Sequence, residues 1–365
     1  MTETSTFASL RESTGPVVLR GAVAGWPGMD FLKDLGDAAE LVTTWRVHPH
    51  GSSSVWESEC IFLEASLGHF VAWEREDVLD EGNPFAPFNR GGHWVYADYK
   101  RLEEFTEDKL NLLGPLVDWG VLGCSKRLED STFWLGSEGS HTPLHHDTYG
   151  LNLVAQLHGR KKWTLFPPED TEHLYPTRIP YEESSVFSQV DVRAPDLKRQ
   201  VMNFSTLYPL TVFPKFGKAK PVVINLVPGD ALYVPKHWWH FVETQETSLS
   251  VNIWVDHPGD AEDRATESLA RVLATSLARE LMDEVGPGWL NPTEEGIWSM
   301  QETMEVAGLA LKGMGVSEED EGGNKKDNHN PKALEERRAP LSVHALVDCF
   351  ASPKVLKMVL EEARQ

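Results

Sequence analysis

The segment from Ser140 to Asp147 carries two side chains that could bind a metal ion. It reads Ser-His-Thr-Pro-Leu-His-His-Asp. Successive side chains of an extended chain point to opposite faces, so His145 and Asp147 share one face and His146 takes the other. An imidazole and a carboxylate on one face can supply two corners of a metal site. In a chain with 14 histidines a His-x-Asp pattern also arises by chance, so this segment alone is weak evidence.

A second segment offers the third corner. Residues 228–243 read Pro-Gly-Asp-Ala-Leu-Tyr-Val-Pro-Lys-His-Trp-Trp-His-Phe-Val-Glu, which predicts a turn, a strand and a further strand that contains His240. Two histidines and one carboxylate that leave the other positions open form the facial triad of non-haem Fe(II) oxygenases. The alternative is that His237 and His240 are structural histidines in an aromatic-rich core.

A third segment, residues 152–166, predicts a hairpin with polar side chains inside. If the chain turns at His158 and Gly159, cross-strand partners share a face, and this face carries Asn152, Gln156 and Lys161. The same face carries the large apolar side chains of both strands. We therefore expect it to be the interior.

A lysine inside a β-barrel is unfavourable unless an anion neutralises it. A bound dicarboxylate would satisfy Lys161, and Thr142 and Asn152 could add hydrogen bonds. The alternative is that Lys161 reaches the rim or pairs with an acidic residue of the chain. Periodicity leaves both open.

The elements that must position these residues are short strands. Short β-rich runs separated by glycine and proline are typical of a barrel or jelly roll. The predicted strands cover residues 131–135, 152–157, 161–166, 222–227, 231–234 and 248–255. We expect a mainly β fold whose core is residues 131–257.

The flanking regions predict additional parts. Residues 1–130 predict a mixed α/β part that packs on the barrel, with a strand near 16–21 and a helix over 31–42. Asp260 can cap a helix that ends at Gly286-Pro287, and a second helix can begin at Asn291-Pro292. The remaining predicted parts are a helical region at 258–314, a disordered acidic linker at 315–339 and further helices at 340–365.

Composition narrows the function classes. The chain has 34 Lys and Arg against 56 Asp and Glu, a net charge of −22, which disfavours binding to nucleic acids and anionic membranes. Three cysteines far apart indicate no disulfide framework. We find neither a signal peptide nor an apolar run long enough to span a membrane. We expect a cytoplasmic protein, and a nuclear location is compatible with the sequence.

Together these segments resemble the JmjC and cupin-like 2-oxoglutarate-dependent oxygenases, particularly the asparaginyl-hydroxylase and tRNA-wybutosine-hydroxylase branch. The resemblance spans residues 15–257, and its motifs are Thr-Pro-Leu-His-His-Asp at 142–147, Gly-Arg-Lys-Lys-Trp-Thr-Leu-Phe-Pro-Pro at 159–168 and Pro-Gly-Asp-Ala-Leu-Tyr-Val-Pro-x-x-Trp-Trp-His at 228–240. It implies a double-stranded β-helix (the jelly-roll or cupin fold) with a C-terminal helical appendage. The implied activity is hydroxylation of a protein or RNA side group while 2-oxoglutarate is decarboxylated to succinate.

The resemblance also implies a ligand set. Fe(II) would be bound by His145, Asp147 and His240, with O2 as the second substrate. The distal carboxylate of 2-oxoglutarate would meet Lys161. The residues implied in the co-substrate pocket are Tyr96, Thr142, Asn152, Lys161 and Asn252. Two departures stand out: the spacing from Asp147 to Asn152 is one residue longer than in the asparaginyl hydroxylases, and residues 200–212 look like an insertion or a gene-model artefact.

Residues 174–188 narrow the resemblance to a group that associates with small heat-shock proteins, which implies such a partner. An alternative function is therefore a catalytically silent adaptor that binds and modulates a small heat-shock protein. A Zn or Mn cupin isomerase would fit the three ligands but leaves Lys161 and Thr142 unexplained. The C-terminal helices resemble those that join two protomers in related hydroxylases, so they could form a homodimer or simply cover the barrel.

Overall fold

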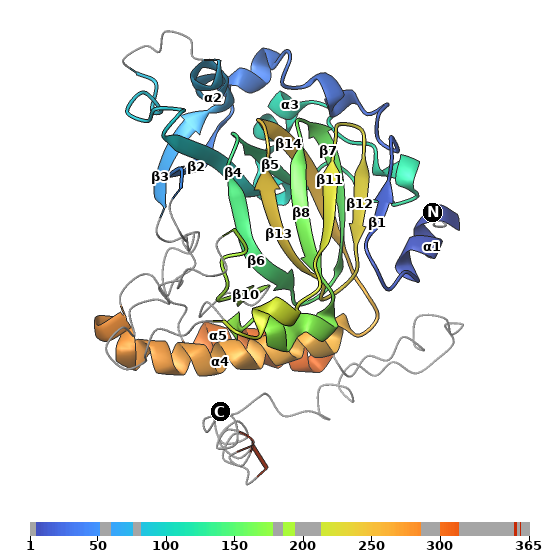
Figure 1. Ribbon diagram of the computed structural model, residues 1–365, viewed down its shortest axis with the longest axis vertical. Helices are drawn as coiled ribbons and strands as arrows, with labels where there is room; N and C mark the ends of the chain where they lie inside the picture. The colour runs from blue at the N-terminus through green and yellow to red at the C-terminus, as the bar shows by residue number, and fades with distance from the viewer. Residues whose placement is uncertain are drawn as a thin grey trace, which may run out of the picture.

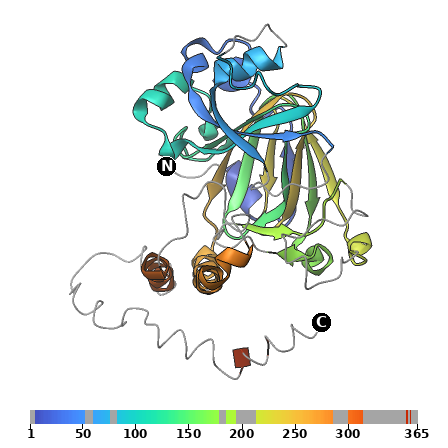
Figure 2. The ribbon, with the colours of Figure 1, turned by 90° about the vertical axis from the view of Figure 1, so that its left-hand side faces the viewer.

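Two antiparallel β-sheets that face each other form the centre of the molecule (Figures 1 and 2). The computed structural model describes residues 5–51, 60–75, 82–177, 185–193, 213–285 and 300–313, together with 354, 355 and 358. One sheet has eight strands in the order β1-β12-β7-β14-β5-β4-β2-β3, and the other has six in the order β11-β8-β13-β6-β10-β9. This arrangement is the jelly-roll sandwich that the sequence predicts.

The strands and helices have the following bounds. The strands are β1 (Val17–Leu19), β2 (Val42–Pro49), β3 (Ile61–Ser66), β4 (His93–Arg101), β5 (Thr132–Gly136), β6 (His141–Asp147), β7 (Leu151–His158), β8 (Lys161–Phe166), β9 (Pro176–Thr177), β10 (Ser185–Ser188), β11 (Val222–Leu226), β12 (Ala231–Val234), β13 (Trp239–Thr244) and β14 (Ser248–Val255). The helices are α1 (Ser5–Arg11), α2 (Leu67–Glu74), α3 (Glu107–Leu113), α4 (Asp260–Val285) and α5 (Met300–Gly313).

The main hydrophobic core lies on one face of the eight-stranded sheet. Alternate residues of β7 and β14, such as Leu153 and Ile253, are buried there against side chains of the N-terminal part, including Trp26, Phe70 and Leu116. Because side chains alternate along a strand, the other residues of β7 and β14 face the six-stranded sheet. This alternation turns a row of polar side chains toward the space between the sheets.

The N-terminal part contributes strands to the same sheet. β2, β3 and β4 extend it beyond β5, and β1 pairs with β12 at the opposite edge. The helix predicted over 31–42 is wrong: the chain forms two short 3-10 turns, Pro27–Asp30 and Gly36–Glu40, and β2 begins at Val42. Gly36 takes a φ of +49°, a left-handed conformation that interrupts an α-helix.

The predicted hairpin at His158 and Gly159 is also wrong. β7 pairs with β12 and β14 in the eight-stranded sheet, whereas β8 pairs with β11 and β13 in the six-stranded sheet. The chain therefore turns a corner between the sheets. Gly159 sits at this corner with a φ of +61°, and a Cβ atom there would lie 2.0 Å from the Thr247 carbonyl oxygen. Despite this corner, the inward faces of β7 and β8 both point into the space between the two sheets.

α4 and α5 pack together across one end of the sandwich (Figure 1). Leu269 and Val272 of α4 meet Met304 and Ala307 of α5. α4 runs from Asp260 to Val285. Asp260 is its first helical residue rather than its cap, because its side chain accepts from the N–H groups of Gly150 and His257, which precede the helix. The Gly286-Pro287 pair lies outside the described residues. Among the described residues, no helix is long and apolar enough to cross a membrane. A homodimer through these helices stays a prediction.

Several sequence predictions lie outside the described residues. They are the start of the second C-terminal helix at 291–299, the linker at 315–339, most of the segment at 340–365 and the apparent insertion at 200–212. Of the three cysteines, Cys60 and Cys124 are buried, and Cys349 lies outside the described residues.

Candidate metal and co-substrate site

His145, Asp147 and His240 meet between the two sheets. His145 and His240 lie directly opposite each other on β6 and β13, and their rings are 4.2 Å apart between centroids. Asp147 follows two residues after His145 on the same face, with 3.9 Å between His145 Nε2 and Asp147 Oδ1. One ligand atom from each residue lies within 4.8 Å of the others. The structure thus brings together the three residues that the sequence predicts as metal ligands.

Hydrogen bonds on the far side of each histidine aim its Nε2 atom at this centre. His145 Nδ1 lies 2.7 Å from the Pro143 carbonyl oxygen, and His240 Nδ1 lies 3.0 Å from that of Trp238. A carbonyl oxygen can only accept, so each Nδ1 carries the proton and donates. When the ring is neutral, each Nε2 then presents a lone pair, which is how imidazole binds a metal.

Burial favours the neutral form of His145. Desolvation, together with the neighbouring His240, holds the pKa of His145 well below its usual value. A neutral imidazole is the form that binds a metal. His146 points away, as alternation predicts, and packs against Trp239 and His237. Two imidazoles and one carboxylate therefore fit a divalent metal such as Fe(II).

All eight predicted site residues line one cavity of about 410 Å³. They are Tyr96, Thr142, His145, Asp147, Asn152, Lys161, His240 and Asn252. Asn152 lines the cavity despite the longer spacing from Asp147. Its Oδ1 accepts a hydrogen bond from Asn252 Nδ2 at 2.9 Å, and Asn252 Oδ1 accepts one from Trp134 Nε1 at 2.7 Å. These amides form a fixed polar wall.

Lys161 is buried, with only 2% of its surface exposed. Its Nζ atom donates to Ser250 Oγ at 2.8 Å and to Tyr96 Oη at 3.2 Å. Among the described residues no carboxylate lies within ion-pair distance of it; Asp98, whose charge acts on it, is paired with Arg46 at 2.6 Å. Burial lowers the pKa of Lys161 to about 7, although Asp98 raises it. An anion in the cavity would stabilise its charged form.

Five residues that contact the predicted ones or act on the charge of Lys161 were not among the predictions. Ser250 and Trp254 lie on the inward face of β14 with Asn252, so alternation along 248–255 could have identified them. Trp134, Arg46 and Asp98 come from strands β5, β2 and the bulged β4, and no motif in the sequence marks them.

Comparison with known proteins agrees with this architecture. Residues 89–261 match the cupin-like domain family. The chain is 37% identical to the HSPB1-associated protein 1 homolog of Danio rerio, over 81% of this chain and 64% of the relative. It is 44% identical to HSPB1-associated protein 1 of Homo sapiens, over 76% of this chain and 55% of the relative. The match to lysine-specific demethylase 8 of Danio rerio is 27%, over 66% of this chain and 52% of that protein.

The matched region thus covers between half and two thirds of these relatives. Residues 89–261 match the cupin-like domain family, and the chain is similar over most of its length to proteins named HSPB1-associated protein 1.

Proposed function

We propose that this chain is an Fe(II)- and 2-oxoglutarate-dependent oxygenase that hydroxylates a side group of a protein or an RNA. One observation carries the proposal. A single cavity holds a triad of two histidines and one carboxylate together with a buried lysine that has no carboxylate at ion-pair distance among the described residues. The triad fits an iron ion, and the buried lysine fits the distal carboxylate of a dicarboxylate.

The chain's residues divide into two groups by role. His145, Asp147 and His240 would hold the metal, which together with 2-oxoglutarate supplies the oxidising chemistry when bound. Lys161 would bind the distal carboxylate, with further hydrogen bonds from the hydroxyl groups of Tyr96 and Ser250. Because these groups are already fixed by the strands, binding requires little rearrangement of the cavity.

The buried charges support one anionic end rather than a neutral ligand. Arg46 and Asp98 form a buried ion pair, which leaves the charge of Lys161 unbalanced among these three residues. A Zn or Mn isomerase without a keto acid would leave this lysine unexplained. The unbalanced charge of Lys161 therefore favours a ligand that carries a carboxylate at the end opposite the one that binds the metal.

The test is anaerobic binding of 2-oxoglutarate to Mn(II)-loaded protein. We expect binding that Lys161→Ala weakens by about 100-fold, since a buried charge-assisted pair is lost. Lys162→Ala is the matched control, because Lys162 points to the other face of β8 and does not line the cavity. Absence of binding by the intact, metal-loaded protein would overturn the oxygenase proposal.

A second candidate is an adaptor for a small heat-shock protein, and the names of the relatives favour it. The two functions are compatible. Asp147→Ala separates them: an adaptor should retain its partner in a pull-down with this variant, while an oxygenase should lose 2-oxoglutarate turnover. Loss of partner binding in a folded Asp147→Ala variant would contradict a purely structural role for the site.

A further inference from the structure

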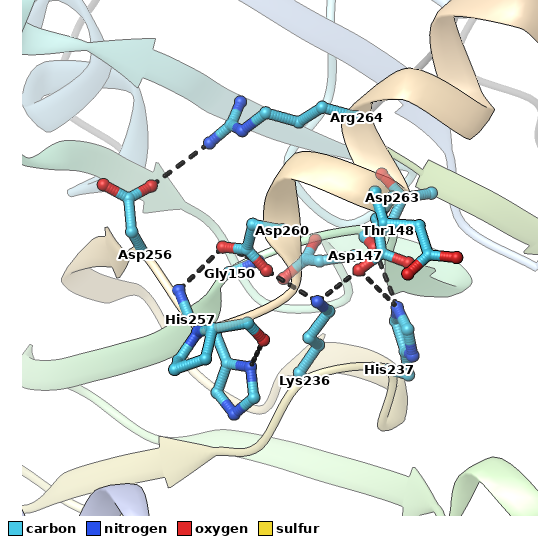
Figure 3. Close-up of polar contacts among 12 residues, drawn as sticks. Asp147, Thr148, Gly150, Lys236, His237, Asp256, His257, Asp260, Asp263 and Arg264 are labelled. Carbon is cyan, nitrogen blue, oxygen red and sulfur yellow. Dashed lines mark hydrogen bonds and ion pairs between the residues drawn. The ribbon is translucent and has the colours of Figure 1, made fainter. Parts of the chain in front are cut away.

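The turn that follows the metal ligand Asp147 is held at each of its three residues. This turn, Thr148 to Gly150, joins β6 to β7. Its contacts come from two places: the turn between β12 and β13, which leads to His240, and the first turn of α4 (Figure 3). These contacts therefore join two segments of the chain that each adjoin a candidate ligand, Asp147 and His240.

Gly150 is held by Asp260, the first residue of α4. Asp260 Oδ2 accepts hydrogen bonds from the backbone N–H of Gly150 at 3.1 Å and of His257 at 2.7 Å. Its other oxygen pairs with Lys236 Nζ at 2.7 Å, and Lys236 also contacts Asp263. Burial alone would raise the pKa of Asp260, but the bonds from Lys236, His257 and Gly150 outweigh it and hold the pKa below its usual value. Asp260 is thus a charged anchor at the base of the helix.

Thr148 is held by His237. His237 Nε2 lies 2.8 Å from the Thr148 carbonyl oxygen and donates to it. His237 has a φ of +64°, a conformation that non-glycine residues adopt only when their surroundings enforce it. The bond to Thr148 and the neighbouring Lys236 ion pairs supply that constraint.

Tyr149 is held by Arg264, one turn into α4. The Arg264 guanidinium lies 3.8 Å from the centroid of the Tyr149 ring, and it also pairs with Asp256 at 3.3 Å. All three side chains line the cavity. The start of α4 therefore forms part of the cavity wall as well as a support for the turn.

We propose that Lys236, His237, Asp260 and Arg264 are positioning residues that fix the 148–150 turn and thereby set the geometry of Asp147 in the metal site. We call these four residues the α4 clamp. The proposal rests on the proposed metal site. It gives the C-terminal helical region a role in the site, because α4 is continuous with the clamp.

Mn(II) binding to the full-length protein tests the clamp without any substrate. Outer partners of metal ligands typically change affinity by 10- to 100-fold, so we expect Lys236→Met and Asp260→Asn each to weaken Mn(II) binding about tenfold. The electron paramagnetic resonance spectrum of the bound ion should broaden or shift as Asp147 loses its fixed geometry. Lys236→Arg, which keeps the charge, should restore most of the affinity.

Asp230→Asn is the matched control. Asp230 makes the same kinds of contact at the opposite end of β12: it pairs with Arg20 and accepts from the N–H groups of Gly21 and Val227. We expect it to lower the melting temperature but leave Mn(II) affinity within about twofold. If the clamp variants acted only by lowering stability, Asp230→Asn would weaken Mn(II) binding as much as they do.

The outcomes are distinguishable. No Mn(II) binding by the wild-type protein overturns the proposed function and this inference with it. Wild-type binding with equal affinity in folded Lys236→Met and Asp260→Asn overturns the inference alone. If these two variants fail to fold, Arg264→Gln decides, since 45% of that side chain is exposed and its loss is tolerated more easily; unchanged affinity and spectrum there also overturn the proposal.

Discussion

Trp254 donates its indole N–H to Oδ2 of Asp147 over 3.0 Å, from the sheet opposite the one that carries Asp147. Trp254 lies on β14 of the eight-stranded sheet, and Asp147 ends β6 of the six-stranded sheet. The contact therefore joins the two sheets at the candidate metal centre. It also occupies one carboxylate oxygen and leaves Oδ1 toward His145.

Trp254→Phe should weaken Mn(II) binding by about tenfold, because the carboxylate loses the partner that orients it. The melting temperature should fall only slightly, since the ring is partly exposed and a phenyl group retains much of its packing. A Mn(II) titration followed by electron paramagnetic resonance measures the change. Trp73→Phe removes a comparable indole bond, to the Phe88 carbonyl, far from the site and should leave affinity unchanged. Equal affinities in the two variants would refute the orienting role.

The affinity for 2-oxoglutarate should fall as pH rises above neutrality. Burial lowers the pKa of Lys161 to about 7, so the unliganded lysine loses its proton above that pH. A bound carboxylate favours the charged form, and binding must then take up a proton. Between pH 6 and pH 8 we expect the dissociation constant to rise about tenfold.

Calorimetry at saturating Mn(II), in buffers of different ionisation enthalpy, should detect the proton uptake directly. Lys161→Met should bind weakly and without this pH dependence. A wild-type affinity that is flat from pH 6 to pH 8 would show that Lys161 is charged throughout, and the prediction would be wrong.

Arg46→Met should weaken 2-oxoglutarate binding although Arg46 does not line the cavity. Without its partner, the buried Asp98 would be free to neutralise Lys161, whose pKa it already raises. The double variant Arg46→Met/Asp98→Asn should recover affinity, because it removes the competing anion. Since breaking a buried ion pair also costs about 3–5 kcal/mol of stability, the decisive measurement is the pH profile. In Arg46→Met the weakening between pH 6 and pH 8 should disappear, and a profile like that of the wild type would contradict the mechanism.

The three candidate metal ligands could be identified from the sequence because their signal is local. Alternation places His145 and Asp147 on one face whatever sheet β6 joins, and the motif around His240 supplies the third corner. Lys161 and Asn152 could be placed by the same argument, because alternation along each residue's own strand turns its side chain inward. The alternation also extends to Ser250 and Trp254, which were within reach of the same argument.

Pairing between distant strands could not be predicted in the same way. Two β-runs separated by His158 and Gly159 have the pattern of a hairpin, and only contacts remote in sequence place them in different sheets. The Arg46–Asp98 pair depends equally on the non-local packing of β2 against β4. The segment 31–42 has spaced apolar residues, but they are buried by tertiary contacts rather than by a helix.

The corner between β7 and β8 leads to a prediction about stability. Gln156 is fully buried there, and its Nε2 atom donates to the carbonyl oxygens of His158 at 2.6 Å and Gly159 at 3.1 Å. It also lies 2.7 Å from Ser248 Oγ on β14. The side chain therefore holds the crossing strand against the sheet that it leaves.

Gln156→Leu should lower the free energy of unfolding by about 2 kcal/mol, because buried carbonyl oxygens lose their donor. The loss is moderated because the Oε1 atom of Gln156 has no hydrogen-bond partner among the described residues, so its removal carries no penalty. Urea unfolding measures the change, and Gln245→Leu, at an exposed position, is the control. Since the corner supports the fold rather than the ligands, Mn(II) affinity should stay within about twofold of the wild type. A stability equal to that of Gln245→Leu would mean that Gly159 alone is sufficient for the crossing between the sheets.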